Sequence, residues 1–126
     1  MQVSFTRIFA DADGVSHFEE MSMQLQQGFA VPPAEPLFSA PFLAAEGTVW
    51  VGAPSTWKGD VAHPSPQKQI FVTVRGEYQV TAGDGSSRQF PPGAVLLLED
   101  TRGSGHSTKI TSSEDVIVFA IRLSSL

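Results

Sequence analysis

The chain has 126 residues, with 13 acidic and 8 basic side chains and a formal net charge of −5 at neutral pH. A chain of this length is expected to form one domain that buries about two-thirds of the surface of its unfolded state. The Lys and Arg residues are scattered rather than clustered, which argues against nucleic acid as a partner. Because the chain has no cysteine, disulfides and thiolate metal sites are excluded, and any metal would need His, Gln or carboxylate ligands.

Targeting signals are also missing from the pattern. No apolar run approaches the length of about 20 residues that a membrane-spanning helix needs. The first residues, MQVSFTRIF, do not have the pattern of a signal peptide. We therefore expect a cytoplasmic protein without a membrane partner.

The N-terminal part of the chain has the alternation of β-strands. Residues 3–9 alternate between apolar and polar types, and residues 11–14 (DADG) are typical of a turn. Residues 15–26 could be placed on a helix, but no helix cap precedes them and their apolar residues include Met21, Met23 and Leu25, spaced two apart. We predict a strand there.

Four prolines interrupt the next segment, residues 28–41. Proline lacks a backbone donor and fixes φ, so a regular central strand is excluded. The segment is expected to be an extended loop or edge segment that carries Phe29, Leu37 and Phe38 across the body of the protein.

Short strands separated by Gly and Pro turns fill the rest of the chain. The pattern predicts them at residues 48–52, 67–74, 77–82, 94–98, 105–111 and 116–123. Asp84–Gly85 between alternating residues indicates a tight hairpin, and no helix of about ten residues or more is predicted. We expect an all-β jelly roll or barrel: a single domain over residues 1–126, with N-terminal strands and a Pro-rich segment in 1–47 and the barrel in 48–126.

The run from His63 to Gly76 (HPSPQKQIFVTVRG) is the centre of the functional hypothesis. Its alternation places Gln69, Phe71 and Thr73 on one face of a strand. His63 and His106 are far apart in sequence and each lies at the edge of a strand. We expect them to meet because the sheet closes on itself, which makes a small barrel with a pocket in its mouth.

These residues resemble the cupin superfamily of double-stranded β-helix barrels. The first cupin motif is usually G-x5-H-x-H-x3,4-E-x6-G, and here His63-x-Ser65-x3-Gln69-x6-Gly76 keeps the spacing of its second half. Ser65 stands in place of the second histidine and Gln69 in place of the glutamate. Gly59 lies near, but not at, the position of the first glycine.

The second cupin motif, P-x-G-x2-H-x3-N, is similar to Gly103-x2-His106, with Thr101 in place of the proline and Ile110 in place of the asparagine. The resemblance covers residues 48–123. Together with the DADG, PP, HP-P--Q and EDT-G-GH patterns, it points to a group of small single-domain bacterial cupins. Because cupins include dioxygenases, isomerases, epimerases, decarboxylases and binders, the resemblance does not assign a reaction.

In metal-binding cupins, three histidines and a glutamate hold iron, manganese, nickel or zinc. The resemblance leaves His63, Gln69 and His106 as metal ligands in this chain, since Ser65 is too short to replace an imidazole. Two imidazoles and an amide are a poor set unless Glu99, Asp100 or a substrate adds negative charge. Binding of one divalent metal and a metal-free pocket are therefore both open. A metal enzyme would be of the oxygenase or isomerase type.

Several hypotheses without metal remain. The pocket could bind or sense a small molecule without turnover, and some epimerase cupins use a histidine base with a tyrosine acid, here His63 with Tyr78. The two histidines could also be remnants without a catalytic role. The expected pocket walls are Trp50, Trp57, Ser65, Phe71 and Phe90.

Three further features carry weaker expectations. Glu99–Asp100 could be a general acid/base pair, a solvated turn, or a support for the loop that presents His106. His17 lies outside both motifs and is expected at a strand or subunit contact. The resemblance, and the need of exposed N-terminal strand edges for a partner, imply a homodimer.

Overall fold

The structure, a computed structural model, describes residues 1–124, in which there are twelve strands and no helix. None of these residues forms a helix with the length and apolar character needed to cross a membrane. The strands are β1 (Gln2–Ala10), β2 (Ser16–Gln24), β3 (Gln26–Phe29), β4 (Leu37–Ser39), β5 (Ala45–Ala53), β6 (Lys58–His63), β7 (Gln69–Arg75), β8 (Tyr78–Thr81), β9 (Ser87–Phe90), β10 (Val95–Glu99), β11 (His106–Ile110) and β12 (Val116–Leu123).

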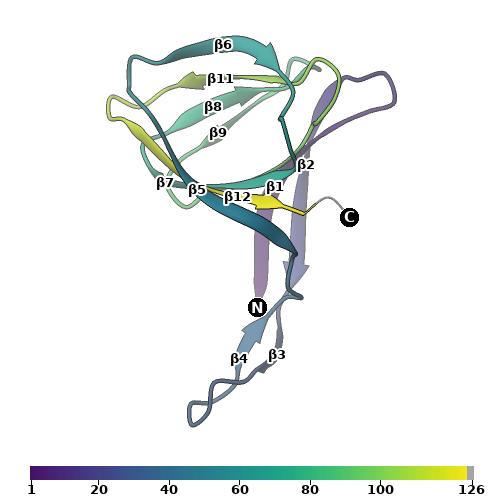
Figure 1. Cartoon of the computed structure of the whole chain (residues 1–126), viewed down its shortest axis with the longest axis vertical. Coiled ribbons are helices and arrows are strands. Elements are labelled where there is room, and N and C mark those ends of the chain that lie inside the picture. Colours follow the sequence, from purple (N-terminus) through teal and green to yellow (C-terminus); the bar gives the residue numbers. More distant parts are fainter. Residues whose placement is uncertain (125–126) are drawn as a thin grey trace.

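Two large sheets face each other (Figure 1). The first has six strands in the order β2-β1-β10-β7-β12-β5, and the second has four in the order β6-β11-β8-β9. Among residues 1–124 only β1 and β10 pair in parallel, and the other strand pairs are antiparallel. The all-β expectation is confirmed. The expectation of a closed barrel is not, because within the described residues no ladder joins the edges of the two sheets.

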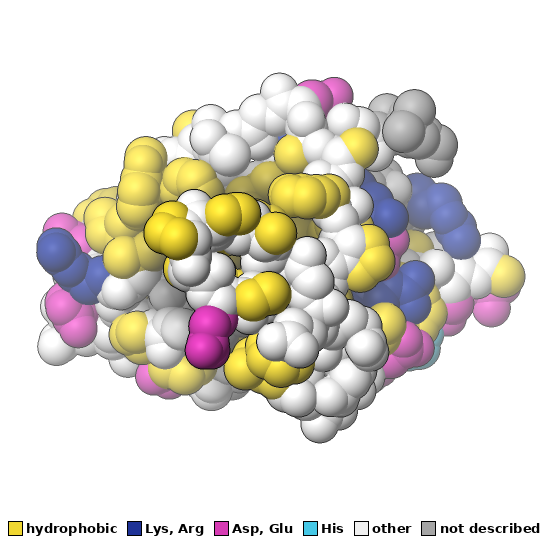
Figure 2. All heavy atoms as spheres, turned by 90° about the horizontal axis from the view of Figure 1, so that it is seen from below, with side chains coloured by type: hydrophobic (Ala, Val, Ile, Leu, Met, Phe, Trp, Pro, Cys, Tyr) yellow, Lys and Arg dark blue, Asp and Glu magenta, His cyan; other side chains and the backbone are white. Residues whose placement is uncertain are grey.

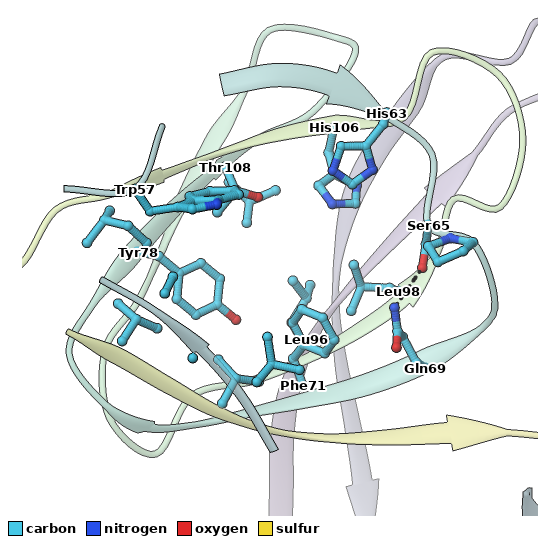
Figure 3. A pocket seen from close by; sticks show the side chains of 18 residues that line it. Trp57, His63, Ser65, Gln69, Phe71, Tyr78, Leu96, Leu98, His106 and Thr108 are labelled. Atoms are coloured by element: carbon cyan, nitrogen blue, oxygen red, sulfur yellow. Dashed lines mark hydrogen bonds between the residues drawn. The ribbon is translucent and has the colours of Figure 1, made fainter. Parts of the chain in front are cut away.

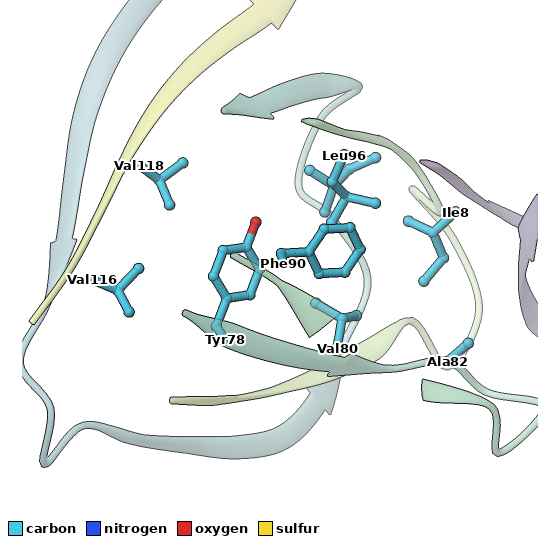
Figure 4. Close-up of a cluster of buried hydrophobic side chains, with 9 residues drawn as sticks. Ile8, Tyr78, Val80, Ala82, Phe90, Leu96, Val116 and Val118 are labelled. Atoms are coloured by element: carbon cyan, nitrogen blue, oxygen red, sulfur yellow. The ribbon is translucent and has the colours of Figure 1, made fainter. Parts of the chain in front are cut away.

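The core lies between the sheets because the inward residues of each strand are apolar. Along β12, the inward residues Val116, Val118 and Ala120 are buried, while the residues between them face the other side. Nine buried side chains form one cluster, drawn in Figure 4: Ile8, Tyr78, Val80, Ala82, Phe90, Leu96, Leu98, Val116 and Val118. Each large apolar side chain contributes about 1.5–3 kcal/mol by leaving water, so this cluster holds the two sheets together.

Most predicted strands are confirmed. Residues 16–24 form β2 rather than a helix, and the DADG turn joins it to β1 with Gly14 at a φ of 80°. The hairpin at Asp84–Gly85 joins β8 to β9, and Gly85 has a φ of 89°, which only glycine adopts without strain. No helix occurs in the described part of the chain, as predicted.

Two strands of the large sheets differ from the prediction. The sequence pattern does not predict β6, whose residues KGDVAH have little β propensity, and pairing with β11 is what holds it as a strand. The predicted strand at residues 48–52 is longer in the structure, because β5 continues through Ala45–Ala53 along β12.

The Pro-rich segment does not cross the body, and that expectation is wrong. Strands β3 and β4 pair with each other into a hairpin that projects away from the two large sheets (Figure 1). The consecutive prolines Pro32 and Pro33 fall in the loop of this hairpin, where no ladder donor is needed. As a result, the side chains of Phe29, Leu37 and Phe38 are exposed rather than packed on the core.

Candidate functional site

A cavity of about 300 Å³ lies between the two large sheets. Its floor and walls are mainly apolar, and most of them come from β7, β8, β10, β11 and β12 (Figure 3). The apolar side chains include Phe71, Leu96, Leu98, Ile110, Val116 and Val118. Its volume is at the lower end of the range for pockets that bind small organic molecules.

Two histidines form the polar end of this cavity. His63 and His106 are register partners on the neighbouring antiparallel strands β6 and β11, and their ring centroids are 5.3 Å apart. They meet because their strands are adjacent, so the expectation that a closing sheet brings them together is wrong. Gly105 allows this approach: it has a φ of 69°, and a Cβ there would collide with the backbone carbonyl of His63.

His106 is held from behind by Asp100. The Oδ2 atom of Asp100 lies 2.5 Å from Nδ1 of His106, and both side chains are buried. The other oxygen of Asp100, Oδ1, is buried without a hydrogen-bond partner among the described residues. An ionised carboxylate only accepts, so His106 donates through Nδ1 and its neutral form leaves Nε2 unprotonated.

His63 has the same tautomer for a different reason. Its Nδ1 lies 3.0 Å from the carbonyl oxygen of Pro64, which can only accept, so Nδ1 donates. In the neutral imidazole, Nε2 is then free to accept. Figure 3 shows the two imidazoles side by side at one end of the cavity.

Ser65 and Gln69 also line the cavity, but they bond to each other. The Ser65 hydroxyl donates to the carbonyl oxygen of Gln67 at 2.7 Å and accepts from Nε2 of Gln69 at 3.1 Å. This chain of bonds fixes the orientation of the Gln69 amide. Both side chains are buried, and their first role is to anchor the loop that leads from His63 into β7.

This donor set does not fit a divalent metal. Gln69 offers only a neutral amide oxygen, since its Nε2 donates to Ser65. Asp100 bonds to the back of His106, so two imidazoles face the cavity without an ionised ligand beside them. No group of three or more His, Asp or Glu side chains in the described residues is arranged to hold a metal ion. A transition metal prefers more imidazole or carboxylate ligands than this cavity offers.

Tyr78 faces the cavity from β8. Its ring stacks on Phe90 with centroids 5.3 Å apart. Among the described residues its buried hydroxyl makes no hydrogen bond of normal geometry, and the Thr73 hydroxyl, also buried without a partner, lies nearby. Burial raises the pKa of Tyr78 to about 12, and the nearby Thr73 hydroxyl offsets only part of that rise. The phenol therefore stays protonated at physiological pH and can donate a hydrogen bond.

Of the expected pocket walls, Trp57, Ser65 and Phe71 line the cavity, whereas Trp50 and Phe90 do not. Trp50 lies on the outer face of β5, is 64% exposed and packs on Phe119. Phe90 is buried behind Tyr78, on the core side of its ring. The indole of Trp57 lies where a Cβ at Gly59 would stand, so this glycine makes room for the cavity wall.

The two adjacent carboxylates of Glu99–Asp100 are not an acid/base pair. Glu99 bonds to Nε of Arg7 at 2.7 Å and Nζ of Lys68 at 2.8 Å, whereas Asp100 turns inward to His106. Burial opposes ionisation of Glu99, but the bonds from Lys68 and Arg7 outweigh it and hold the pKa of Glu99 below its usual range. The expectation of a solvated turn is wrong for Asp100, which supports His106 instead.

His17 is outside the cavity, in a small charged cluster. Its Nε2 lies 2.6 Å from Asp11 and its Nδ1 lies 3.1 Å from Asp84. The bond to Asp11, more than the bond to Asp84, raises the pKa of His17 above its usual value. The cluster joins the β1–β2 turn to the β8–β9 hairpin, which is a contact between strands of one chain.

The chain matches no family model, and no curated protein sequence matches it closely enough to indicate a relationship. The resemblance to cupins therefore depends on the motif spacing in the sequence.

Proposed function

We propose that this chain is a cupin-like protein that binds a small organic molecule in the cavity between its sheets. The strand order supports the cupin fold. Strands β5, β12, β7 and β10 are consecutive neighbours in one sheet, and β6, β11, β8 and β9 in the other. This interleaving is the arrangement of an eight-stranded jelly roll, the architecture to which cupins belong.

One observation carries the binding proposal. A buried carboxylate orients an imidazole, His106, at the end of a cavity whose other walls are mostly apolar. A pocket with apolar walls and a few convergent polar groups is the usual form of a small-molecule site. A buried polar pair that served packing alone would be replaceable by apolar side chains, at little or no cost in stability.

Binding without metal is the form of this proposal that the donor set supports. If a metal were bound, His63 and His106 would hold it, and Gln69 could join only through its neutral amide oxygen, since its Nε2 donates to Ser65. A catalytic variant also remains: His63 would act as base and Tyr78 as acid, since both face one cavity and the Tyr78 phenol stays protonated. Incorporation of solvent deuterium into a bound ligand would separate this variant from simple binding.

The binding proposal is tested by blocking the cavity. Val51 lines the cavity yet is 42% exposed, so it lies at the opening, and Val51→Trp should fill the opening without disturbing the core. Val49 is two residues earlier on the same strand, is 46% exposed and does not line this cavity, so Val49→Trp is a matched control. A panel of neutral, anionic and cationic single-ring compounds would be screened by ligand-observed NMR. We expect hits that Val51→Trp loses and Val49→Trp keeps; equal loss, or no hit, would contradict the proposal.

We propose in addition that a second copy of this chain covers the hairpin and the free edge of β5. The hairpin patch, defined as Phe29, Val31, Leu37, Phe38, Phe42 and Leu43, is apolar and exposed. Figure 2 shows hydrophobic side chains gathered on the face seen from the hairpin end. Exposed apolar patches of this kind mark interaction surfaces.

Two features favour a second copy over an unrelated partner. Within the described residues β5 pairs only with β12, so its other edge presents free backbone groups that a strand from another chain could use. Residues 26–43 contain a single charged side chain, Glu35, and so offer little for a charged partner to recognise. A two-fold axis at the β5 edge would pair the two β5 strands and cover both hairpin patches at once.

A further inference from the structure

The charge of the cavity wall limits the charge that a ligand can carry. None of the residues that line it is Lys, Arg, Asp or Glu, and its ionisable side chains are the two histidines and Tyr78. Burying a charge that is not paired costs several kcal/mol or more. The wall is therefore suited to a neutral molecule rather than to a carboxylate, phosphate or ammonium compound.

The imidazole end selects the ligand further. Each Nδ1 is already bonded, in His63 to a carbonyl and in His106 to Asp100. In the neutral form of each ring, Nε2 is then an acceptor at the imidazole end of the cavity, while Nε2 of Gln69 donates to Ser65. Two adjacent acceptors favour a ligand group that donates a hydrogen bond, such as a hydroxyl.

Tyr78 provides a second polar position that is independent of the histidines. Its side chain is 96% buried (4% exposed), its hydroxyl has no partner in the described residues, and it points into the cavity in Figure 3. Tyr78 is the register partner of Ile110, four residues along β11 from His106, which is about 13 Å along the strand. A buried hydroxyl without a partner is costly, and a ligand that reaches this wall would supply one.

From these contacts we infer that the ligand is a neutral, mainly apolar molecule with a hydroxyl group at the imidazole end and a second neutral polar group towards Tyr78. This inference rests on the proposed function and specifies the ligand class of the same cavity.

Three probes of nearly equal size test the imidazole end at pH 7.5: p-cresol, 4-methylanisole and 4-methylbenzoate. Capping the hydroxyl as the methyl ether replaces the donated proton by a methyl group and keeps the ring, so 4-methylanisole should bind about 3- to 10-fold more weakly than p-cresol by calorimetry. The anion 4-methylbenzoate should bind at least about 10-fold more weakly, since nothing in the wall neutralises it. Equal affinity of p-cresol and its ether, or tighter binding of the benzoate, would overturn the inference while leaving the binding proposal intact.

Tyr78→Phe tests the second position, because it removes the hydroxyl and keeps the ring that stacks on Phe90. The probe 4-(hydroxymethyl)phenol should bind wild-type protein about 3- to 10-fold more tightly than p-cresol. That gain should vanish in Tyr78→Phe, and a cooperative urea unfolding transition of the variant would show that it is folded. A gain that persists in the variant would overturn the role of Tyr78. Failure of every probe to bind wild-type protein, in a cavity that the screening panel also leaves empty, would overturn the proposed function itself.

Discussion

The carboxylate of Asp100 and the imidazole of His106 form a buried pair, with Oδ2 2.5 Å from Nδ1. Asp100 also bonds through its backbone, since its carbonyl oxygen accepts from the Ser65 amide at 2.9 Å. The same residue thus fixes the His106 ring and the loop that follows His63. The two sides of the polar end are positioned by one buried residue, through its side chain on one side and its backbone on the other.

The first prediction concerns this pair. Asp100→Ala leaves Nδ1 of His106 buried without an acceptor and should lower the free energy of unfolding by about 1–3 kcal/mol. Asp100→Asn keeps an oxygen at the same position and should cost less. Urea denaturation measures both, and long-range proton–nitrogen NMR reports the tautomer. A neutral His106 with its proton on Nε2 in wild-type protein would contradict the assignment.

The second prediction concerns Gly105, where the backbones of β6 and β11 meet. In Gly105→Ala the new Cβ would collide with the His63 carbonyl, and the residue would also be held at a φ of 69°. We expect a loss of about 1–3 kcal/mol in the free energy of unfolding from the backbone strain alone, and a larger loss from the collision. Gly85→Ala is the control, because its φ of 89° is similar but nothing lies within 4 Å. Equal losses in the two variants would show that the close approach carries no cost.

Much of this fold is predictable from local pattern, and the parts that are not have identifiable causes. Alternating residues and Gly turns predict β2, the β8–β9 hairpin and β12 because each is specified within a few residues. β6 is not predictable in this way, since its pairing with β11 depends on residues more than forty positions away. The position of the projecting β3–β4 hairpin is not predictable either, because no local sequence signal indicates whether a segment packs on the two large sheets or extends away from them.

In the candidate site, too, some residues are predictable from the sequence and others are not. Motif spacing predicts His63 and His106, and the structure brings them together. For Asp100 the sequence leaves three alternatives open, among them support for the loop that presents His106, because an acidic residue before a Gly-rich loop usually faces solvent. Only the fold shows that it turns inward. A signal was nevertheless present, since an acidic residue six positions before a motif histidine is a candidate support for that histidine.

The third prediction concerns the pH dependence of stability through His17. The pKa of His17 is raised, chiefly by the bond to Asp11. Its contribution to the stability of the fold is therefore complete below the usual histidine pKa near 6.5, and it is lost as the pH rises through the raised pKa. The pKa of Asp11 is lowered by His17, and that of Asp84 chiefly by Ser86. Their contributions are present above the usual carboxyl range and are lost as the pH falls through the lowered values.

The stabilising window therefore lies between the usual pKa of aspartate and the raised pKa of His17. His17→Gln should lower Tm within this window, and the difference from wild-type protein should shrink at higher pH. Thermal unfolding from about pH 4.5 to 9 measures it, with higher salt expected to reduce the effect because the cluster is exposed. A difference in Tm that does not change with pH would show that charge is not involved.

The fourth prediction concerns metal. Because two imidazoles without an ionised ligand are a weak set, the purified, untagged protein should not retain one equivalent of iron, manganese, nickel or zinc after dialysis against each ion. Elemental analysis measures retention. One equivalent in wild-type protein that is lost in both His63→Ala and His106→Ala would contradict the metal-free proposal and restore the set His63, Gln69 and His106.

The fifth prediction concerns self-association through the hairpin patch. Phe42 is 90% exposed and lies beside Phe29, with ring centroids 6.3 Å apart, so Phe42→Asp places a charge in the middle of the patch. Burying that charge in an apolar interface costs several kcal/mol or more, so a dimer in the wild-type protein should become a monomer in the variant. Val61→Asp is the control, since Val61 is 76% exposed on β6, in the other large sheet.

Sedimentation equilibrium measures the masses of the three proteins. We expect twice the chain mass for wild-type protein and Val61→Asp, and the chain mass for Phe42→Asp. A wild-type protein that stays monomeric at concentrations up to about 100 μM would refute the proposal that a second copy covers the hairpin patch and the β5 edge. An obligate interface that pairs two edge strands is stable well below that concentration. A Phe42→Asp protein that remains a dimer would instead place the interface on another surface, away from the hairpin.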